Sequence, residues 1–180
     1  MSIHDFSVKD IHGKEVQLSD FEGKTLLIVN TATKCSLTPQ YNDLEELYQK
    51  YKDKGLVVLA FLSNDFGETP ESNQEIVQFL ADNYELTFPL FAKISVNDEN
   101  AHPLYTYLKS KQSDEIGNSK YEILLEIISE MGLARTGDDI KWNFTKFLVN
   151  KDGKVTQRFA PTVSTKEMES AIQEELANVA

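Results

Sequence analysis

Cys35 is the residue whose type and position best fit a chemical role. It is the one cysteine among 180 residues, and it lies between an apolar run and a predicted helix start at Thr38. A helix N-terminus offers unpaired N–H groups and a partial positive charge, and Lys34 adds a cation beside the thiol. Both features favour the thiolate, which is the nucleophilic form, so we expect a lowered thiol pKa. Free cysteines are also typical of apolar packing, so position alone leaves a structural role open.

The elements around Cys35 form a strand–helix–strand unit. Residues 26–29 and 56–61 are unbroken apolar runs, which is typical of parallel strands covered on both faces. Between them we expect a helix capped by Thr38, with Pro39 at its first position and Gly55 at its exit. Its apolar stripe consists of Leu44, Leu47, Tyr48 and Tyr51. The connection should be right-handed, and strand carboxyl ends are where α/β proteins build sites.

The rest of the chain predicts a mixed sheet with helices on both faces. Hairpins are expected at 6–18 and 144–159, a short strand at 88–91 and a short helix at 100–109. Two further helices begin with capping boxes, one formed by Ser72 and Glu75 and one by Ser164 and Glu167. The buried face of the last helix consists of Met168, Ile172, Leu176 and Val179. We see no repeat or linker. The prediction is one α/β domain over residues 1–180 with a central mixed β-sheet.

Residues 111–139 stand outside that plan as an inserted segment. They predict an amphipathic helix near 118–132, with one acidic face at four-residue spacing. The apolar side holds Tyr121, Leu124, Leu125, Ile128 and Met131, and the acidic face holds Glu122, Glu126 and Glu130. One interpretation is that this helix only covers the core. The other is that Ile123, Ile127 and Leu133 widen the stripe enough to meet a second copy of the chain.

Composition excludes several functions. The net charge of −11 disfavours nucleic acid and stable membrane association, and no apolar run is long enough to span a bilayer. We see no secretory signal, and a lone cysteine fits a reducing cytoplasm. His4 and His12 give no metal spacing, and His102 before Pro103 fits a helix cap. No glycine-rich phosphate loop is visible, so we expect neither metal nor cofactor.

Long stretches of the chain resemble the glutathione peroxidase family, in its cysteine-containing form. The stretches are 23–41 (GKTLLIVNTATKCSLTPQY), 88–94 (FPLFAKI), 96–97 (VN), 100–105 (NAHPLY), 141–149 (KWNFTKFLV) and 158–162 (RFAPT). The resemblance covers nearly the whole chain outside 111–139. It implies a thioredoxin-like fold, which agrees with the order of elements above.

The resemblance implies a site in which Cys35 attacks peroxide. In the family a tryptophan and an asparagine, matching Trp142 and Asn143, surround the sulfur together with a glutamine. Indole and amide N–H groups can stabilise both a thiolate and the charge on the departing oxygen. Cys35 would become a sulfenic acid, and the enzyme would serve in defence against oxidative stress.

The sequence departs from the family pattern at the second signature, residues 59–66 (LAFLSNDF). Its cysteine is replaced by Ser63, and the register places the catalytic glutamine at Thr69, whose single donor is on a shorter arm. Asn64 remains and could support the loop. The glycine after the nucleophile is Ser36. We therefore expect lower turnover than a complete site would give.

The resolving cysteine of thioredoxin-using members is absent from residues 79–84, and one cysteine cannot form an internal disulfide. An external thiol, either glutathione or a thioredoxin-type protein, must then reduce oxidised Cys35. The leading hypothesis is a peroxidase that reduces hydrogen peroxide or organic hydroperoxides. The alternatives are a peroxide sensor or relay with little turnover, and a redox-silent thioredoxin-like interaction scaffold.

Overall fold

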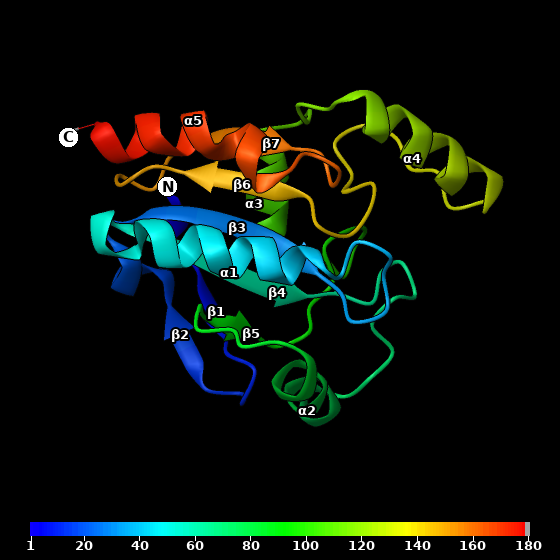
Figure 1. The fold of residues 1–180 in the computed structure, drawn as a ribbon, viewed down its shortest axis with the longest axis horizontal. Helices are drawn as coiled ribbons and strands as arrows, with labels where there is room; N and C mark the ends of the chain where they lie inside the picture. Colours follow the sequence, from blue (N-terminus) through cyan, green and yellow to red (C-terminus); the bar gives the residue numbers. More distant parts are fainter. Residues whose placement is uncertain (179–180) are drawn as a thin grey trace.

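A computed structural model describes residues 1–178 and centres on a five-stranded mixed sheet (Figure 1). The strand order is β5-β4-β3-β6-β7. The strands are β3 (Thr25–Thr31), β4 (Leu56–Leu62), β5 (Leu90–Phe91), β6 (Lys146–Val149) and β7 (Val155–Phe159). Strands β3, β4 and β5 are parallel, and β6 is antiparallel to both of its neighbours. The predicted α/β class with a mixed sheet is confirmed.

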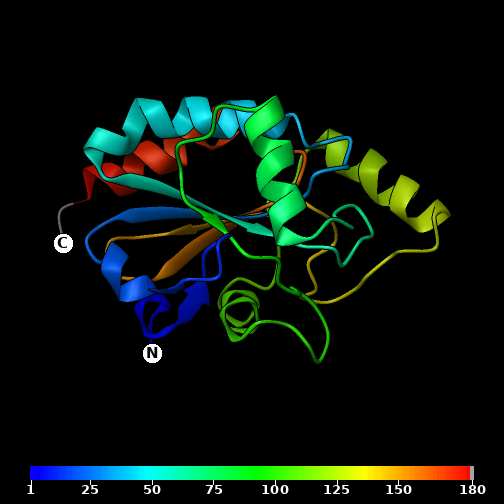
Figure 2. The same ribbon diagram turned by 90° about the horizontal axis from the view of Figure 1, so that it is seen from below.

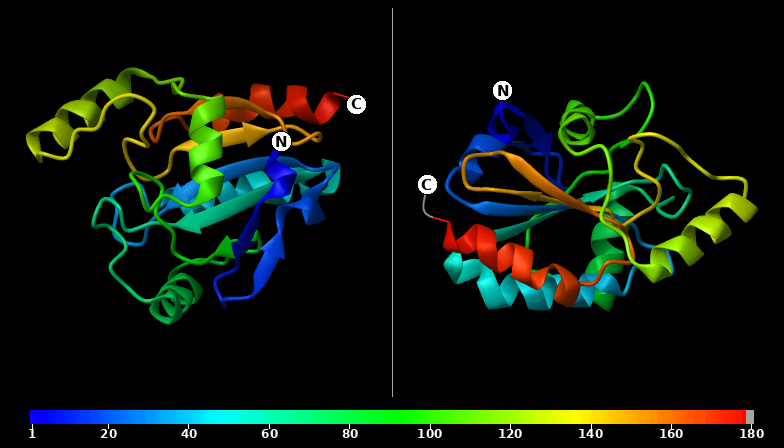
Figure 3. Two further views of the ribbon diagram at one scale, coloured as in Figure 1. Left: turned by 180° about the vertical axis from the view of Figure 1, so that it is seen from behind. Right: turned by 90° about the horizontal axis from the view of Figure 1, so that it is seen from above.

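Helices cover both faces of this sheet. Helices α1 (Gln40–Tyr51) and α5 (Thr165–Ala177) lie side by side on one face, and α3 (Pro103–Lys111) lies on the other (Figures 2 and 3). Helix α2 (Asn73–Asn83) lies near the β5 edge (Figure 1). Every residue of β3 is buried, which explains why its apolar run does not alternate.

The amino-terminal residues form the expected hairpin. Strands β1 (Ser7–Lys9) and β2 (Glu15–Gln17) pair antiparallel, and the turn between them uses Gly13 at a φ of 85°. The hairpin joins the β5 edge through a bridge between Asp10 and Phe91. Short 3-10 segments lie at η1 (Ile3–Asp5), η2 (Leu18–Phe21) and η3 (Lys52–Lys54).

The helix starts are mostly those that the sequence predicts. Ser72 with Glu75, and Ser164 with Glu167, form capping boxes at α2 and α5. His102 caps α3 because its Nδ1 accepts from the Leu104 amide at 3.1 Å. Met168 and Ile172 are buried and Leu176 is partly buried, while Val179 lies outside the described residues.

The predicted start of α1 is wrong by one residue. The helix begins at Gln40, with Pro39 at the N-cap position and no side-chain cap. The Thr38 hydroxyl instead accepts from the Cys35 amide at 3.0 Å and donates to the Ala32 carbonyl at 3.2 Å. The Thr38 hydroxyl therefore stabilises the loop that carries Cys35 and does not cap the helix.

The inserted helix is present as α4 (Ser119–Glu130), and it projects away from the body of the molecule (Figures 1 and 2). Tyr121 and Ile128 are buried, but Leu125 and Met131 are exposed, so the interpretation that the helix only covers the core does not account for these two. The large apolar side chains that stay exposed on this segment are Ile116, Ile123, Leu125, Ile127, Met131 and Leu133. Association of two copies through this surface stays a prediction.

A buried arginine fixes both ends of the insertion. Arg158 on β7 donates to the carbonyls of Gln112 and Asp138, and it lies 3.3 Å from the Glu115 carboxylate. Because Arg158 is almost fully buried, its pKa is lowered. Carbonyls accept from its Nη1 and Nη2 groups, whereas its Nε has no partner within residues 1–178. The segment that returns from α4 is thereby held where it leads into Trp142.

Among residues 1–178, no helix has the length and apolar character needed to cross a bilayer.

Candidate active site

Three segments meet at the carboxyl ends of β3 and β4 and place Cys35 among them (Figure 1). The first is the loop after β3, which carries Cys35, and the second is the loop after β4. The third is the segment before β6, which runs antiparallel to β3 and so begins at the same edge. The sulfur accepts from the Leu37 amide at 3.4 Å, and the cysteine is only 6% exposed.

The pKa of the Cys35 thiol is raised, which contradicts the expected lowering. Burial is the largest cause, because it disfavours the charged thiolate, and the Glu68 carboxylate also raises the pKa. The hydrogen bond from the Leu37 amide and the nearby Trp142 and Asn143 donors lower it, but burial and the Glu68 carboxylate together raise it by more. The resting site therefore holds a protonated thiol surrounded by donors for its ionised form.

The two features that predicted a lowered thiol pKa, the Lys34 cation and the start of α1, are not placed as the sequence predicts. Lys34 pairs with Glu71 at 3.5 Å, and its own amide donates to the Glu68 carbonyl. Because α1 begins at Gln40, its first turn lies farther along the chain from Cys35 than the sequence predicts. Ser36, in the position of the family's glycine, is exposed.

Trp142 and Asn143 both lie near the sulfur. Trp142 is 4% exposed and Asn143 is fully buried, so solvent does not compete for their donors. The Asn143 side-chain nitrogen and oxygen make no hydrogen bond within residues 1–178, although the amide is close enough to lower the thiol pKa. A buried amide without a partner is costly, and such exceptions are typical of sites that keep a donor for a reacting group.

The loop after β4 lies against this pair. Phe66 packs on Trp142, with ring centroids 5.1 Å apart. The Asn64 side chain accepts from the Thr69 amide at 2.9 Å, which is the loop-supporting contact that the sequence predicts. The Thr69 hydroxyl is buried without a partner among residues 1–178, and it is not among the groups that lower the Cys35 pKa. The role of each of these residues stays a prediction.

Sequence reasoning missed the residues that hold the Trp142 segment in place. Asp65 accepts from the Val96 and Asn97 amides at 2.8 and 3.1 Å. The Asn97 side chain in turn pairs with both the N–H and the carbonyl of Ile140, at 2.9 and 2.8 Å. The Asn30 side chain likewise donates to the Trp142 carbonyl and accepts from the Thr145 amide. For Asn30 the sequence did offer a signal, because an asparagine at the end of an apolar strand requires hydrogen-bond partners.

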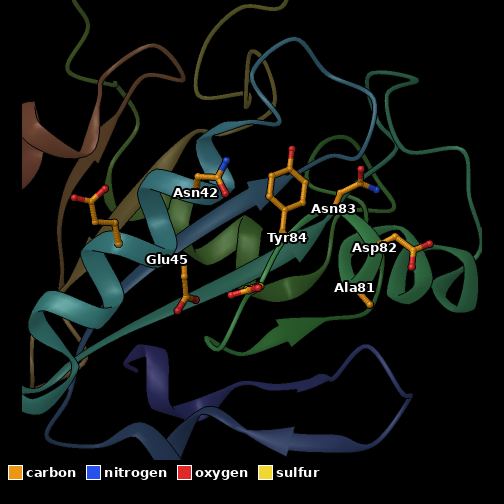
Figure 4. A pocket seen from close by; sticks show the side chains of 8 residues that line it. Asn42, Glu45, Ala81, Asp82, Asn83 and Tyr84 are labelled. Carbon is orange, nitrogen blue, oxygen red and sulfur yellow. The ribbon is translucent and has the colours of Figure 1, made fainter.

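A cavity of about 520 Å³ lies apart from this site, between α1 and the end of α2 (Figure 4). Its lining is acidic and does not include Cys35. The lining residues are Asn42, Glu45, Glu46, Ala81, Asp82, Asn83, Tyr84 and Glu85.

Across residues 1–178, no three His, Cys, Asp or Glu side chains are grouped as a metal site requires.

Solved structures share this architecture. "Crystal structure of Trgpx in apo form" matches with a TM-score of 0.74 and 35% identity, covering 100% of this chain and 99% of that one. "Crystal structure of T. cruzi GPX1" matches at 0.72 and 33%, covering 99% and 100%. A thioredoxin-family thiol:disulfide interchange protein from Chlorobium tepidum, at 0.61 and 14% over 96% and 93%, shows the fold alone. The protein is thus a thioredoxin-like α/β protein with a cysteine at the strand ends.

Sequence comparison identifies the family. The glutathione peroxidase family profile matches residues 3–109. A glutathione peroxidase homolog of Neisseria meningitidis is 48% identical over 96% of this chain and 98% of its own length. A probable phospholipid hydroperoxide glutathione peroxidase of Mesembryanthemum crystallinum is 48% identical over 96% and 91%. The chain belongs to the glutathione peroxidase family and is a thiol peroxidase.

Proposed function

We propose that this peroxidase reduces hydrogen peroxide or organic hydroperoxides through Cys35. The Cys35 thiolate attacks one peroxide oxygen, so that an S–O bond forms while the O–O bond breaks. The departing oxygen takes up a proton and leaves as water or an alcohol, and the sulfur remains as a sulfenic acid. The setting is defence against oxidative stress in the cytoplasm, where an unpaired cysteine stays reduced.

The observation that carries this proposal is the placement of two buried donors beside the only sulfhydryl of the chain, one of which, the Asn143 amide, has no hydrogen-bond partner within residues 1–178. The Trp142 indole and the Asn143 amide lie near the sulfur in a site that water hardly reaches. Such donors stabilise negative charge more strongly than water does, because they are already oriented when the charge develops. They suit both the thiolate and the departing oxygen.

Reduction requires thiols from outside the chain, because Cys35 has no second cysteine as partner. One thiol condenses with the sulfenic acid, releasing water and forming a mixed disulfide. A second thiol then attacks that disulfide and releases Cys35. Glutathione and a thioredoxin-type protein are both candidates. The net charge of −11 disfavours anionic glutathione, and the choice between the two donors stays open.

The test is rapid mixing of the reduced protein with hydrogen peroxide and with a lipid hydroperoxide, while a dimedone-type probe traps the sulfenate. Cys35→Ser should abolish trapping and turnover. Trp142→Phe and Asn143→Ala should each slow oxidation by about 100-fold, the cost of losing one oriented donor. Tyr48→Phe is the matched control, because its partly buried ring packs on Phe88 rather than the sulfur. Peroxide turnover that survives in Cys35→Ser would reject the proposal.

A sensor or relay is the second candidate function, and the buried thiol with its raised pKa favours it. A thiol that ionises reluctantly reacts slowly, and a sulfenic acid without a resolving cysteine persists until a partner thiol arrives. Sustained turnover with excess external thiol distinguishes the peroxidase from a sensor, which oxidises once and stops. A Cys35 thiol that survives equimolar peroxide would instead indicate the redox-silent scaffold.

A further inference from the structure

Asn30 is a buried side chain to which the proposed chemistry assigns no role. It lies in β3, five residues before Cys35, and it is fully buried after four consecutive apolar residues. A primary amide in such a place destabilises the fold unless its donor and acceptor are both satisfied. The contacts that satisfy Asn30 all go to one segment, residues 142–145.

These contacts replace the sheet ladder where it ends. The last β3–β6 pair is Val29 with Lys146, so Asn30 lies one residue beyond the ladder. Its side-chain nitrogen donates to the Trp142 carbonyl at 3.3 Å, and its side-chain oxygen accepts from the Thr145 amide at 3.1 Å. Its backbone carbonyl accepts from the Phe144 amide at 2.6 Å. One residue therefore fixes the backbone on both sides of Asn143.

The backbone held in this way is a conformation that residues with side chains seldom adopt. Phe144 has a φ of 69°, although it is not glycine. Its buried ring packs edge-on against Tyr41 on α1, with centroids 5.7 Å apart, which holds the other side of the turn. Strained residues of this kind persist only where their surroundings fix them, and they gather at functional sites.

The orientation of Asn143 depends on this backbone. Its side-chain amide makes no hydrogen bond within residues 1–178, so no hydrogen bond of its own holds it toward the sulfur. What brings it near Cys35 is the course of the chain from Trp142 to Phe144. The contacts that fix that course come from Asn30, together with the Thr145 hydroxyl, which donates to the Trp142 carbonyl at 3.0 Å.

We propose that Asn30 is a positioning residue for peroxide reduction, which holds the Trp142 and Asn143 donors toward the Cys35 sulfur by clamping a strained turn. The inference rests on the proposed function of Cys35. It assigns Asn30 no contact with substrate. Loss of the clamp lets the Asn143–Phe144 peptide relax, and both donors then move away from the sulfur together.

The test compares Asn30→Leu, which removes all side-chain bonds, with Asn30→Asp, which keeps the acceptor for Thr145 and loses the donor to Trp142. Thr25→Val is the control, because it removes a buried hydroxyl from the other end of β3. Three readouts are needed: the thiol pKa from thiolate absorbance, the rate of sulfenate formation with the thiol fully ionised, and the emission of Trp142, the sole tryptophan.

We expect Asn30→Leu to lose roughly 10- to 100-fold in the rate of the ionised thiol, as a small misplacement of reacting groups costs. Asn30→Asp should lose less, both variants should shift Trp142 emission, and Thr25→Val should match wild type in all three readouts. If Asn30→Leu does not fold, Asn30→Asp decides. A folded Asn30 variant with wild-type rate and emission overturns this inference alone, whereas activity in Cys35→Ser overturns the proposed function.

Discussion

Lys34 and Glu71 form an ion pair, with Lys34 Nζ and Glu71 Oε1 3.5 Å apart. Glu71 also accepts from the Thr33 hydroxyl at 2.6 Å, so the carboxylate is held in the loop next to the cysteine. The positive charge closest to Cys35 in sequence is therefore already engaged by a carboxylate. What acts on the sulfur is burial, the Glu68 carboxylate and neutral donors, and this balance determines how the thiol titrates.

We predict that the rate of Cys35 oxidation rises with pH beyond the usual thiol range. Burial raises the pKa of the thiol, so at neutral pH less than the usual few per cent is thiolate. Only the thiolate attacks peroxide, so the rate should follow the ionised fraction upward. Sulfenate trapping and thiolate absorbance measured from acid to alkaline pH check this. A rate that is already level below neutrality would contradict it.

Glu68→Gln provides a matched test of the same balance. The Glu68 carboxylate raises the pKa of the thiol through its charge, so the neutral amide should move the pH profile of oxidation toward lower pH. The maximal rate at high pH should stay unchanged, because the variant alters ionisation and not the donors. An unmoved profile would show that the Glu68 charge does not contribute to the thiol pKa.

Thr69→Gln should speed peroxide reduction roughly tenfold, because it returns an amide donor to the position where the family has one. The Thr69 hydroxyl is buried and has no partner within residues 1–178, so the substitution breaks no side-chain hydrogen bond there. Thr69→Leu adds similar bulk without a donor and should give no gain. Rates are measured as single-turnover sulfenate formation. Equal rates for the Gln and Leu variants would mean that Thr69 is not at the glutamine position.

The fold was predictable because its signals are local and agree with one another. Uninterrupted apolar runs gave β3 and β4, and the Ser72 and Ser164 capping boxes gave the starts of α2 and α5. The residues that surround the sulfur came from long, specific stretches resembling the family. Those stretches named Trp142 and Asn143, which the structure places near Cys35.

The missed features depend on one local contact in the cysteine loop, on burial, and on a contact between distant segments. The sequence offers Thr38 as a helix cap, but its hydroxyl finds the Cys35 amide instead, so α1 starts later. The thiol pKa depends on burial, and neighbouring charges along the chain do not reveal burial. Asn30 reads as one polar residue at the end of an apolar run, and its clamp becomes visible only when β6 is placed beside β3.

Lys146 should make the stability of the fold rise with pH. It is fully buried, its ammonium donates to the Pro161 and Val163 carbonyls at 2.8 and 3.0 Å, and burial lowers its pKa to about 7. In the unfolded chain its pKa is about 10.4, so between these values the unfolded state binds the extra proton. The free energy of unfolding then gains up to about 1.4 kcal/mol per pH unit above pH 7.

Urea unfolding of wild type and Lys146→Met from neutral to alkaline pH measures this contribution. The Met variant should lack the gain with pH, because it has no proton to lose on folding. Lys154→Met, at an exposed position beside β7, should keep the wild-type slope. Identical slopes in wild type and Lys146→Met would show that the buried amine titrates alike in both states.

The exposed apolar stripe of α4 should mediate association of two copies of the chain. Ile123, Ile127 and Met131 recur every four residues and are 60%, 48% and 51% exposed, and the helix projects from the body of the molecule (Figure 2). Sedimentation should therefore give a mass above 20.4 kDa for wild type. Ile127→Glu should give the monomer, because it places a charge within the stripe. Glu126→Ala, on the acidic face, should not, and a wild-type protein that stays monomeric at high concentration would mean that α4 projects for another reason.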